Sequence, residues 1–171
     1  MKNWGHRYYA LRGYFLVILL VPLAAARVLS PRPVEEAWLM LVLGGVWLRL
    51  WAGSHIGSHS NGITLAAGPR ARTGPYRFLR HPLYLSNVAV AAGLIGFANC
   101  LVLISGLALW ILCLTHHLLL IGMENSLPVS EAAIALPSGW KTAWIRQGRN
   151  IGYTFSAFGV LFLLSFLRDY L

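Results

Sequence analysis

Five long apolar runs, separated by polar stretches rich in glycine and proline, divide this chain. A helix needs about 20 mostly apolar residues to cross the hydrocarbon core of a bilayer, and each run comes close to that length. The pattern therefore predicts an all-α integral membrane protein with five transmembrane helices, forming a single transmembrane domain over residues 1–171. The predicted spans are approximately residues 11–29, 37–56, 83–98, 101–121 and 151–167.

The third and fourth runs are joined only by Ala98-Asn99-Cys100. Because so short a connection forces two helices to lie antiparallel, we expect a tight helical hairpin there. The loops from Gly57 to Pro82 and from Gly122 to Asn150 are long for a chain of this size, and long loops in compact proteins are usually functional or disordered. We favour function, and expect the two loops to form a site together.

The second long loop contains two further local signals. Residues 130–136 lie between two proline-containing turns, and we expect a short interfacial helix there. An amphipathic stretch follows around Trp140 and Trp144, and tryptophan is common at membrane interfaces.

Charge changes this picture by assigning an orientation. The chain is 57% hydrophobic and only 11% charged, yet it carries a net charge of +9. In an apolar chain this balance indicates cytoplasmic loops facing anionic lipid, so membrane lipids are expected partners and nucleic acid is not. The count of Lys and Arg places the amino terminus and both long loops in the cytoplasm and the carboxyl terminus outside. The ten cytoplasmic residues are Lys2, Arg7, Arg12, Arg70, Arg72, Arg77, Arg80, Lys141, Arg146 and Arg149.

We expect no metal site. His55 and His59 have a spacing that could bind a metal on a helix, but the glycines and serines around them argue against a continuous helix. Cys100 and Cys113 show no metal-type spacing and are expected to be buried thiols.

Ionisable residues near the cytoplasmic ends of the spans are the candidates for chemistry. His117 and Glu124 lie about two helical turns apart on one face, whereas His116 points elsewhere. Ionisable groups inside a membrane indicate function, although Glu124 could instead pair with a nearby arginine. Arg49 lies seven residues before the end of the second span, where it would either extend to the headgroups or supply a fixed cation to a carboxylate.

The stretch from Thr73 to Asn87 concentrates the most polar chemistry in the chain. Pro82 suits the first turn of a helix, so Arg80 and His81 would lie at its amino-terminal end, where free N–H groups and the helix dipole favour an anion. From composition alone, a basic cluster that merely orients the helix explains these residues equally well.

The motifs of this stretch resemble those of a known family. Gly74-Pro75-Tyr76 followed by Arg80-His81-Pro82-Leu83-Tyr84 is similar to the signature of the isoprenylcysteine carboxyl methyltransferase family and of related membrane phospholipid methyltransferases. Arg49-Leu50-Trp51-Ala52 resembles a segment that many bacterial members carry before that signature. Glu124 and Leu127 resemble the end of the family's Glu-Glu-x-x-Leu motif, with Met123 in place of its first glutamate.

The resemblance implies an S-adenosylmethionine-dependent methyltransferase of a membrane, expected to be a bacterial inner membrane. The acceptor would be a lipidic or amphipathic small molecule that presents a carboxylate, an amine or a thiol. By position, the cofactor site would be lined by Tyr76, Arg80, His81, Tyr84 and Glu124. We add His117 to this set because it lies on the same helix face as Glu124. The expected catalytic residues are Glu124, Arg49 and Arg146, with Arg149 as the alternative to Arg146.

Two alternatives stay open at this point. The chain could be a non-catalytic membrane protein on the same scaffold, because the segment from Met123 to Trp144 departs from the family's pattern. Less favoured is an enzyme that uses NADPH, like the membrane sterol reductases, which are much longer.

Overall fold

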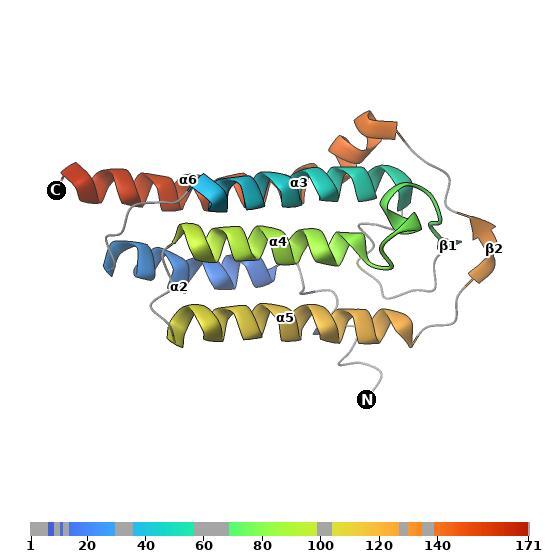
Figure 1. The fold of residues 1–171 in the computed structure, drawn as a ribbon, viewed down its shortest axis with the longest axis horizontal. Helices are drawn as coiled ribbons and strands as arrows, with labels where there is room; N and C mark the ends of the chain where they lie inside the picture. The colour runs from blue at the N-terminus through green and yellow to red at the C-terminus, as the bar shows by residue number, and fades with distance from the viewer. Residues whose placement is uncertain are drawn as a thin grey trace.

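The computed structural model describes residues 7–8, 11, 14–29, 36–56, 69–98, 104–126, 130–134 and 139–170. Within these residues five α-helices make up most of the fold (Figure 1), in agreement with the predicted helical class. A short 3-10 helix, η3 (Gly74–Arg77), precedes the third of them. The α-helices are α2 (Phe15–Leu29), α3 (Glu36–Ile56), α4 (Pro82–Phe97), α5 (Ile104–Asn125) and α6 (Gly139–Tyr170).

Helix α4 lies at the centre of the bundle. It packs against each of the other four helices, and the five axes run along one long direction (Figure 1). Its buried apolar residues join a core to which α2, α3 and α6 also contribute. A helix that is hydrophobic on every side is found in a protein core or in a membrane span, and the central place of α4 agrees with this. The buried apolar residues of α4 are Val90, Ala91, Leu94, Ile95 and Phe97.

The helices alternate in direction along the bundle. The carboxyl ends of α3 and α5 and the amino ends of α4 and α6 lie together with η3 at one end, which we call the η3 end (Figure 1). This is the arrangement that alternating spans require, and it brings the flanks of both long loops to the same end. The orientation of the η3 end relative to a membrane stays a prediction.

Three helices in the described part of the chain are long and apolar enough to cross a bilayer: Glu36–Ile56, Leu107–Asn125 and Gly139–Leu167. Two more apolar helical segments, Ile18–Leu29 and Pro82–Phe97, are shorter. At 1.5 Å per residue the 16 residues of α4 extend about 24 Å, less than the roughly 30 Å of hydrocarbon. The chain is thus an integral membrane protein by composition and helix length, and the count of five spans stays a prediction.

The structure supports the two helices of the expected hairpin but does not describe the turn between them. Helices α4 and α5 pack against one another and run in opposite directions (Figure 1). Residues 99–103, which connect them, lie outside the described residues.

The prediction of a short helix at residues 130–136 is wrong. Ser130–Ile134 forms a strand, β2, that pairs in parallel with β1 (Pro69–Arg70), so that Pro69 lies opposite Ser130. Seven residues are too few for a helix that is stable by itself, whereas pairing with the other long loop gives the segment partners for some of its backbone groups. This pairing joins the two loops that the sequence predicted to form one site.

The fifth helix begins earlier than predicted. Helix α6 starts at Gly139 rather than near residue 151, and its 32 residues span about 48 Å. Lys141, Arg146 and Arg149 lower the hydropathy of its first turns. For this reason the sequence pattern did not show that these turns belong to the same helix as the apolar run. The amphipathic stretch around Trp140 and Trp144 is therefore the first part of the last helix.

A buried arginine ties three helices together at the other end of the bundle. Arg27, in the last turn of α2, is only 2% exposed. Its Nη2 donates a hydrogen bond to Ser165 Oγ of α6 at 2.5 Å, and its guanidinium lies 5.8 Å from the ring centroid of Phe97 of α4. A paired arginine at such depth fixes the relative register of these helices.

Glycines bring α3 and α4 into close contact. A Cβ added at Gly93 or Gly96 would lie within 3 Å of atoms of Trp38, and one at Gly45 would lie 3.0 Å from the backbone oxygen of Ser86 and from the backbone nitrogen of Val90. At Gly45 and Gly93 the atoms in the way include backbone atoms, which cannot move aside, so these two positions accept only glycine at the present helix separation. At Gly96 the atoms in the way belong to the indole ring of Trp38. Small residues at such contacts are the usual basis of tight helix packing in membranes.

We expect Gly45→Ala to destabilise the protein by about 1–3 kcal/mol, the usual cost of overpacking. The added methyl would push α4 away from α3. Gly44→Ala is the matched control, because nothing lies within 4 Å of a Cβ at that neighbouring position. Thermal unfolding in detergent measures both variants. Equal melting temperatures for the two would contradict the close contact.

Candidate functional site

Helix η3 is held against the end of α3 by one glycine. Gly74 has a φ of +58°, and a Cβ there would lie 2.6 Å from the ring of His55, so conformation and space both require glycine. The next turn is closed by N–H groups of Phe78 and Leu79, which donate to the carbonyl of buried Pro75 at 3.1 and 2.9 Å. This local structure fixes Tyr76, which follows Pro75 in the turn, at the η3 end of the bundle.

The hydroxyl of Tyr76 is buried and has no hydrogen-bond partner among the described residues. Burial raises the pKa of Tyr76 above its usual value, the negative charge of Glu124 raises it further, and the positive charge of Arg49 acts in the opposite sense. Tyr76 is therefore neutral at physiological pH. Its hydroxyl is close enough to a carboxylate and a guanidinium for their charges to affect its pKa. A buried hydroxyl without a protein partner is available to form a hydrogen bond with a ligand.

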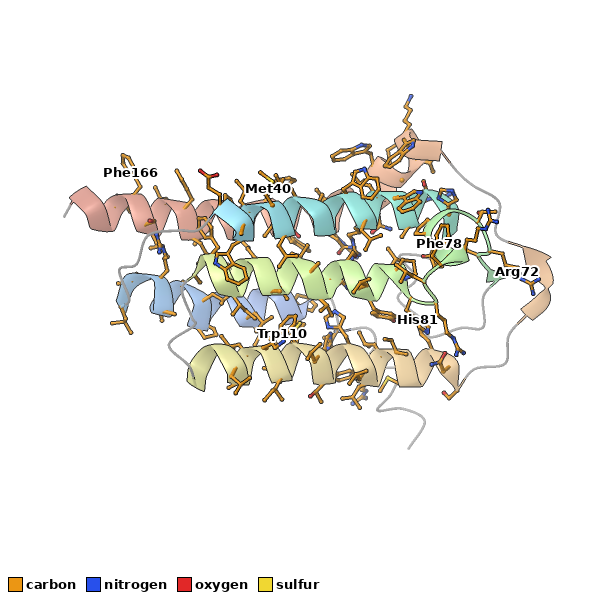
Figure 2. The ribbon with its side chains drawn as sticks, in the orientation of Figure 1. Met40, Arg72, Phe78, His81, Trp110 and Phe166 are labelled. Atoms are coloured by element: carbon orange, nitrogen blue, oxygen red, sulfur yellow. The ribbon has the colours of Figure 1, made fainter. Side chains whose placement is uncertain are left out.

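Glu124 is held by a tyrosine from the central helix. Tyr84 Oη donates a hydrogen bond to Glu124 Oε1 at 2.5 Å, joining the beginning of α4 to the end of α5. The ring of Tyr84 also contacts His81, the residue before α4, with ring centroids 5.9 Å apart. Figure 2 labels His81 at this end of the bundle, with exposed Arg72 and Phe78 on the loop beyond it.

His117 lies beside the same tyrosine. Its ring meets that of Tyr84 edge-to-face at 6.0 Å, so His117 and Glu124 face α4 together, as their spacing predicted. The Nδ1 of His117 lies 2.7 Å from the carbonyl oxygen of Cys113. A carbonyl can only accept, so Nδ1 carries the proton, and in the neutral ring Nε2 is the acceptor.

Arg49 is oriented by a neutral side chain. Its Nη1 donates a hydrogen bond to Asn87 Oδ1, which lies one turn after Tyr84 on α4. Of the two alternatives from sequence, the guanidinium therefore lies inside the bundle rather than at the headgroups. Its positive charge acts to lower the pKa of the Tyr76 hydroxyl. The close packing of α3 and α4 therefore places a fixed cation at the site.

The three remaining arginines predicted for the site are more exposed or lie on α6. Arg80 is exposed, directly before His81. Arg146 is half-buried on α6, beside the buried Gln147, whose side chain packs over Gly53 of α3, whereas Arg149 is exposed. The structure thus brings together Arg49, Tyr76, His81, Tyr84, His117 and Glu124, and favours Arg146 over Arg149 as the arginine nearer the interior.

The described residues contain no group of three or more potential metal ligands. His55 is one half of the pair considered from sequence. Its Nδ1 lies 2.9 Å from the carbonyl oxygen of Trp51, to which it donates. His59 lies outside the described residues.

Sequence reasoning missed three residues around the site. Asn87 had no assigned role, although an amide three positions after Tyr84 lies on the same side of α4 and needs a partner in an apolar span. Tyr8 and Phe15 contact His116 from more than 100 positions away. No local signal could have found that contact.

Comparison with known proteins identifies part of the chain. The model of the isoprenylcysteine carboxyl methyltransferase family matches residues 38–125, just over half of the chain. The matched segment runs from α3 to the end of α5 and contains Arg49, Tyr76, Tyr84 and Glu124. No individual curated protein and no solved structure matches the chain. Helices α2 and α6 lie outside the matched segment.

We expect Glu124→Gln to lower the pKa of Tyr76, because removing the carboxylate's negative charge makes the tyrosinate less unfavourable. Ultraviolet absorbance of tyrosinate against pH measures the effect, with the corresponding Tyr76→Phe protein subtracted in each case. Glu36→Gln, at an exposed glutamate of α3, is the control. An unchanged titration would mean that Glu124 does not act on Tyr76.

The same shift predicts the pH dependence of stability. The pKa of Tyr76 is higher in the folded protein than in the unfolded chain, so folding favours the neutral hydroxyl. The contribution of this neutral group to the free energy of unfolding is complete below pH about 10 and is lost as the pH rises further. Tyr76→Phe should therefore reduce the loss of stability in alkali.

Proposed function

The chain belongs to the isoprenylcysteine carboxyl methyltransferase family, and from this premise we propose that it is an S-adenosylmethionine-dependent methyltransferase acting on a lipidic or amphipathic acceptor. The family is one of membrane methyltransferases, and the helices of this chain suit a membrane. The observation that carries the proposal is the buried Tyr76 hydroxyl, which lies without a hydrogen-bond partner among the described residues and in reach of Arg49 and Glu124.

The donor set at the η3 end fits the cofactor. S-adenosylmethionine carries a carboxylate, an ammonium and a sulfonium, and it needs partners of both charges. Arg49 and the Tyr76 hydroxyl would hold the carboxylate, and Glu124, oriented by Tyr84, would hold a cationic group. The rings of His81 and Tyr84 would contact the purine or the sulfonium.

Bound in this way, the cofactor would supply an electrophilic methyl group on a positively charged sulfur. The task of the protein is then to align the acceptor in line with that bond and to exclude water. The buried hydroxyl of Tyr76 and the buried side chain of His117 support such exclusion. Apolar side chains exposed on α5 and α6 would let a lipidic acceptor approach from the bilayer. Among them are Leu107, Ile111, Leu118, Phe155 and Phe162.

The acceptor group decides what the charged residues must do. A carboxylate acceptor needs only to be positioned, and Arg49 or Arg146 would do this. An amine acceptor must lose a proton, and either Glu124 or the Nε2 of His117 would accept it. A thiol acceptor would need its thiolate stabilised by the same arginines.

The location of the site completes the proposal. The η3 end carries the flanks of both long loops, and the count of Lys and Arg favours a cytoplasmic position for them. A cytoplasmic site has access to S-adenosylmethionine. The carboxyl terminus would then lie on the outer side, and the whole chain would act as one transmembrane domain.

We expect the purified protein in detergent to bind S-adenosylmethionine or its demethylated product saturably. Tyr76→Phe should weaken binding about 10-fold or more, the cost of removing a hydrogen bond to a charged group. His81→Ala and Tyr84→Phe should also weaken it. Tyr153→Phe, at an exposed tyrosine of α6, should bind like the parent. The proposal fails if a folded parent protein shows no saturable binding.

We expect Glu124→Gln to separate binding from turnover if the acceptor is an amine. Losing a general base lowers the rate about 100-fold or more, while the retained hydrogen-bonding side chain keeps much of the cofactor affinity. Transfer of radiolabelled methyl to total lipid, prenylcysteine analogues and small thiols identifies the acceptor and measures the rate. A turnover equal to that of the parent would remove Glu124 from proton transfer.

A further inference from the structure

Two adjacent histidines of α5 are both buried, although they point in different directions. His116 is 6% exposed and His117 is 5% exposed. Successive residues of an α-helix are about 100° apart, so the two side chains face different surroundings. His117 faces α4, and the partners of His116 must come from elsewhere.

Two partners of His116, Tyr8 and Phe15, lie in the first 15 residues of the chain, which we call the amino-terminal segment. The ring of Phe15 stacks on the ring of His116 with centroids 3.9 Å apart and an angle of 5° between the planes. Tyr8 Oη lies 2.6 Å from His116 Nδ1, within hydrogen-bond distance. Stacking fixes the plane of an imidazole but leaves it free to turn over by a half-rotation. The bond to Nδ1 selects one of the two orientations.

These contacts continue into the candidate site. The rings of His116 and His117 meet edge-to-face at 5.2 Å, and Phe15 approaches the edge of His117 at 6.3 Å. His117 in turn meets Tyr84, which donates to Glu124. An unbroken series of ring contacts therefore runs from the amino-terminal segment to the carboxylate at the η3 end.

The two histidines take opposite tautomers when Tyr8 is the donor to His116. Cys113 can only accept at its carbonyl oxygen, so His117 carries its proton on Nδ1. When Tyr8 donates its hydroxyl proton to Nδ1 of His116, the neutral ring carries its proton on Nε2. This difference gives each ring its own spectroscopic signature.

We propose that Tyr8 is a positioning residue of the active site, which holds His117 against Tyr84 by fixing the ring of His116. Tyr8 and Phe15 lie outside residues 38–125, so this support comes from a part of the chain beyond the segment shared with the family. The inference rests on the proposed function for its catalytic consequence. The placement of the rings can be tested without it.

The first test is nitrogen NMR of histidine-labelled protein in detergent. We expect a proton on Nε2 of His116 and on Nδ1 of His117 in the parent. Tyr8→Phe keeps the ring but removes the hydroxyl, so His116 should become a mixture of tautomers and the His117 signals should shift. Tyr14→Phe is the matched control, because Tyr14 lies in the same segment and is 63% exposed. Unchanged His116 and His117 signals in Tyr8→Phe would overturn the proposal.

The second test is a double-mutant cycle on methyl transfer. Tyr8→Phe and His116→Phe, which retains a ring for stacking, should each lower kcat about two- to tenfold, as expected for one neutral hydrogen bond. The KM for the acceptor should change little, and the double variant should be no slower than either single one. Additive losses, or an equal loss in Tyr14→Phe, would overturn the proposal. Absence of cofactor binding in the parent would instead refute the proposed function, and the spectra would still decide the role of Tyr8.

Discussion

The close contact of α3 with α4 is the constraint on which the rest of the structure depends. Gly45, Gly93 and Gly96 let the two backbones approach until a single methyl group would collide. Because of this contact, Arg49 of α3 reaches Asn87 of α4, and the end of α3 can receive η3 against His55. A wider separation would leave a buried guanidinium without its amide partner, which is costly in an apolar bundle.

The cost of burying the polar residues at the η3 end is offset because most of them form hydrogen bonds with one another. Tyr84 donates to Glu124, Asn87 accepts from Arg49, and Cys113 accepts from His117 through its backbone. Tyr76 differs, since its buried hydroxyl has no such partner among the described residues. A site in which rigid charged groups surround one available donor is prepared for a ligand, and this is why the Tyr76 hydroxyl carries the functional proposal.

The segment shared with the family and the additional helices have different tasks. Residues 38–125 hold the polar groups of the site, whereas α2 and α6 enclose the central helix and carry Arg27 and Gln147 into the core. The amino-terminal segment adds the contacts of Tyr8 and Phe15 to His116. The wall around the segment that the family model matches is therefore built by parts of the chain outside that segment.

The helices and most site residues could be predicted from the sequence because their signals are local. Apolar runs predicted the helices to within a few residues, except for the start of α6. The seven-residue spacing predicted that His117 and Glu124 face the same way, and the motif around His81 indicated the family. Charged residues in the first turns of α6 hid that helix, and the strand at residues 130–134 depends on pairing with Pro69 and Arg70, which no local pattern contains.

What only the tertiary structure decided are the contacts between residues far apart in the chain. The sequence left Arg49 with two equal alternatives, and the position of Asn87 on α4 places it inside. It also left His116 pointing away from the site, and Tyr8 and Phe15 show what lies there. A sequence pattern reports which face of a helix is apolar or polar. Which helix covers that face follows from packing the whole bundle, where backbone separation and side-chain volume are decided together.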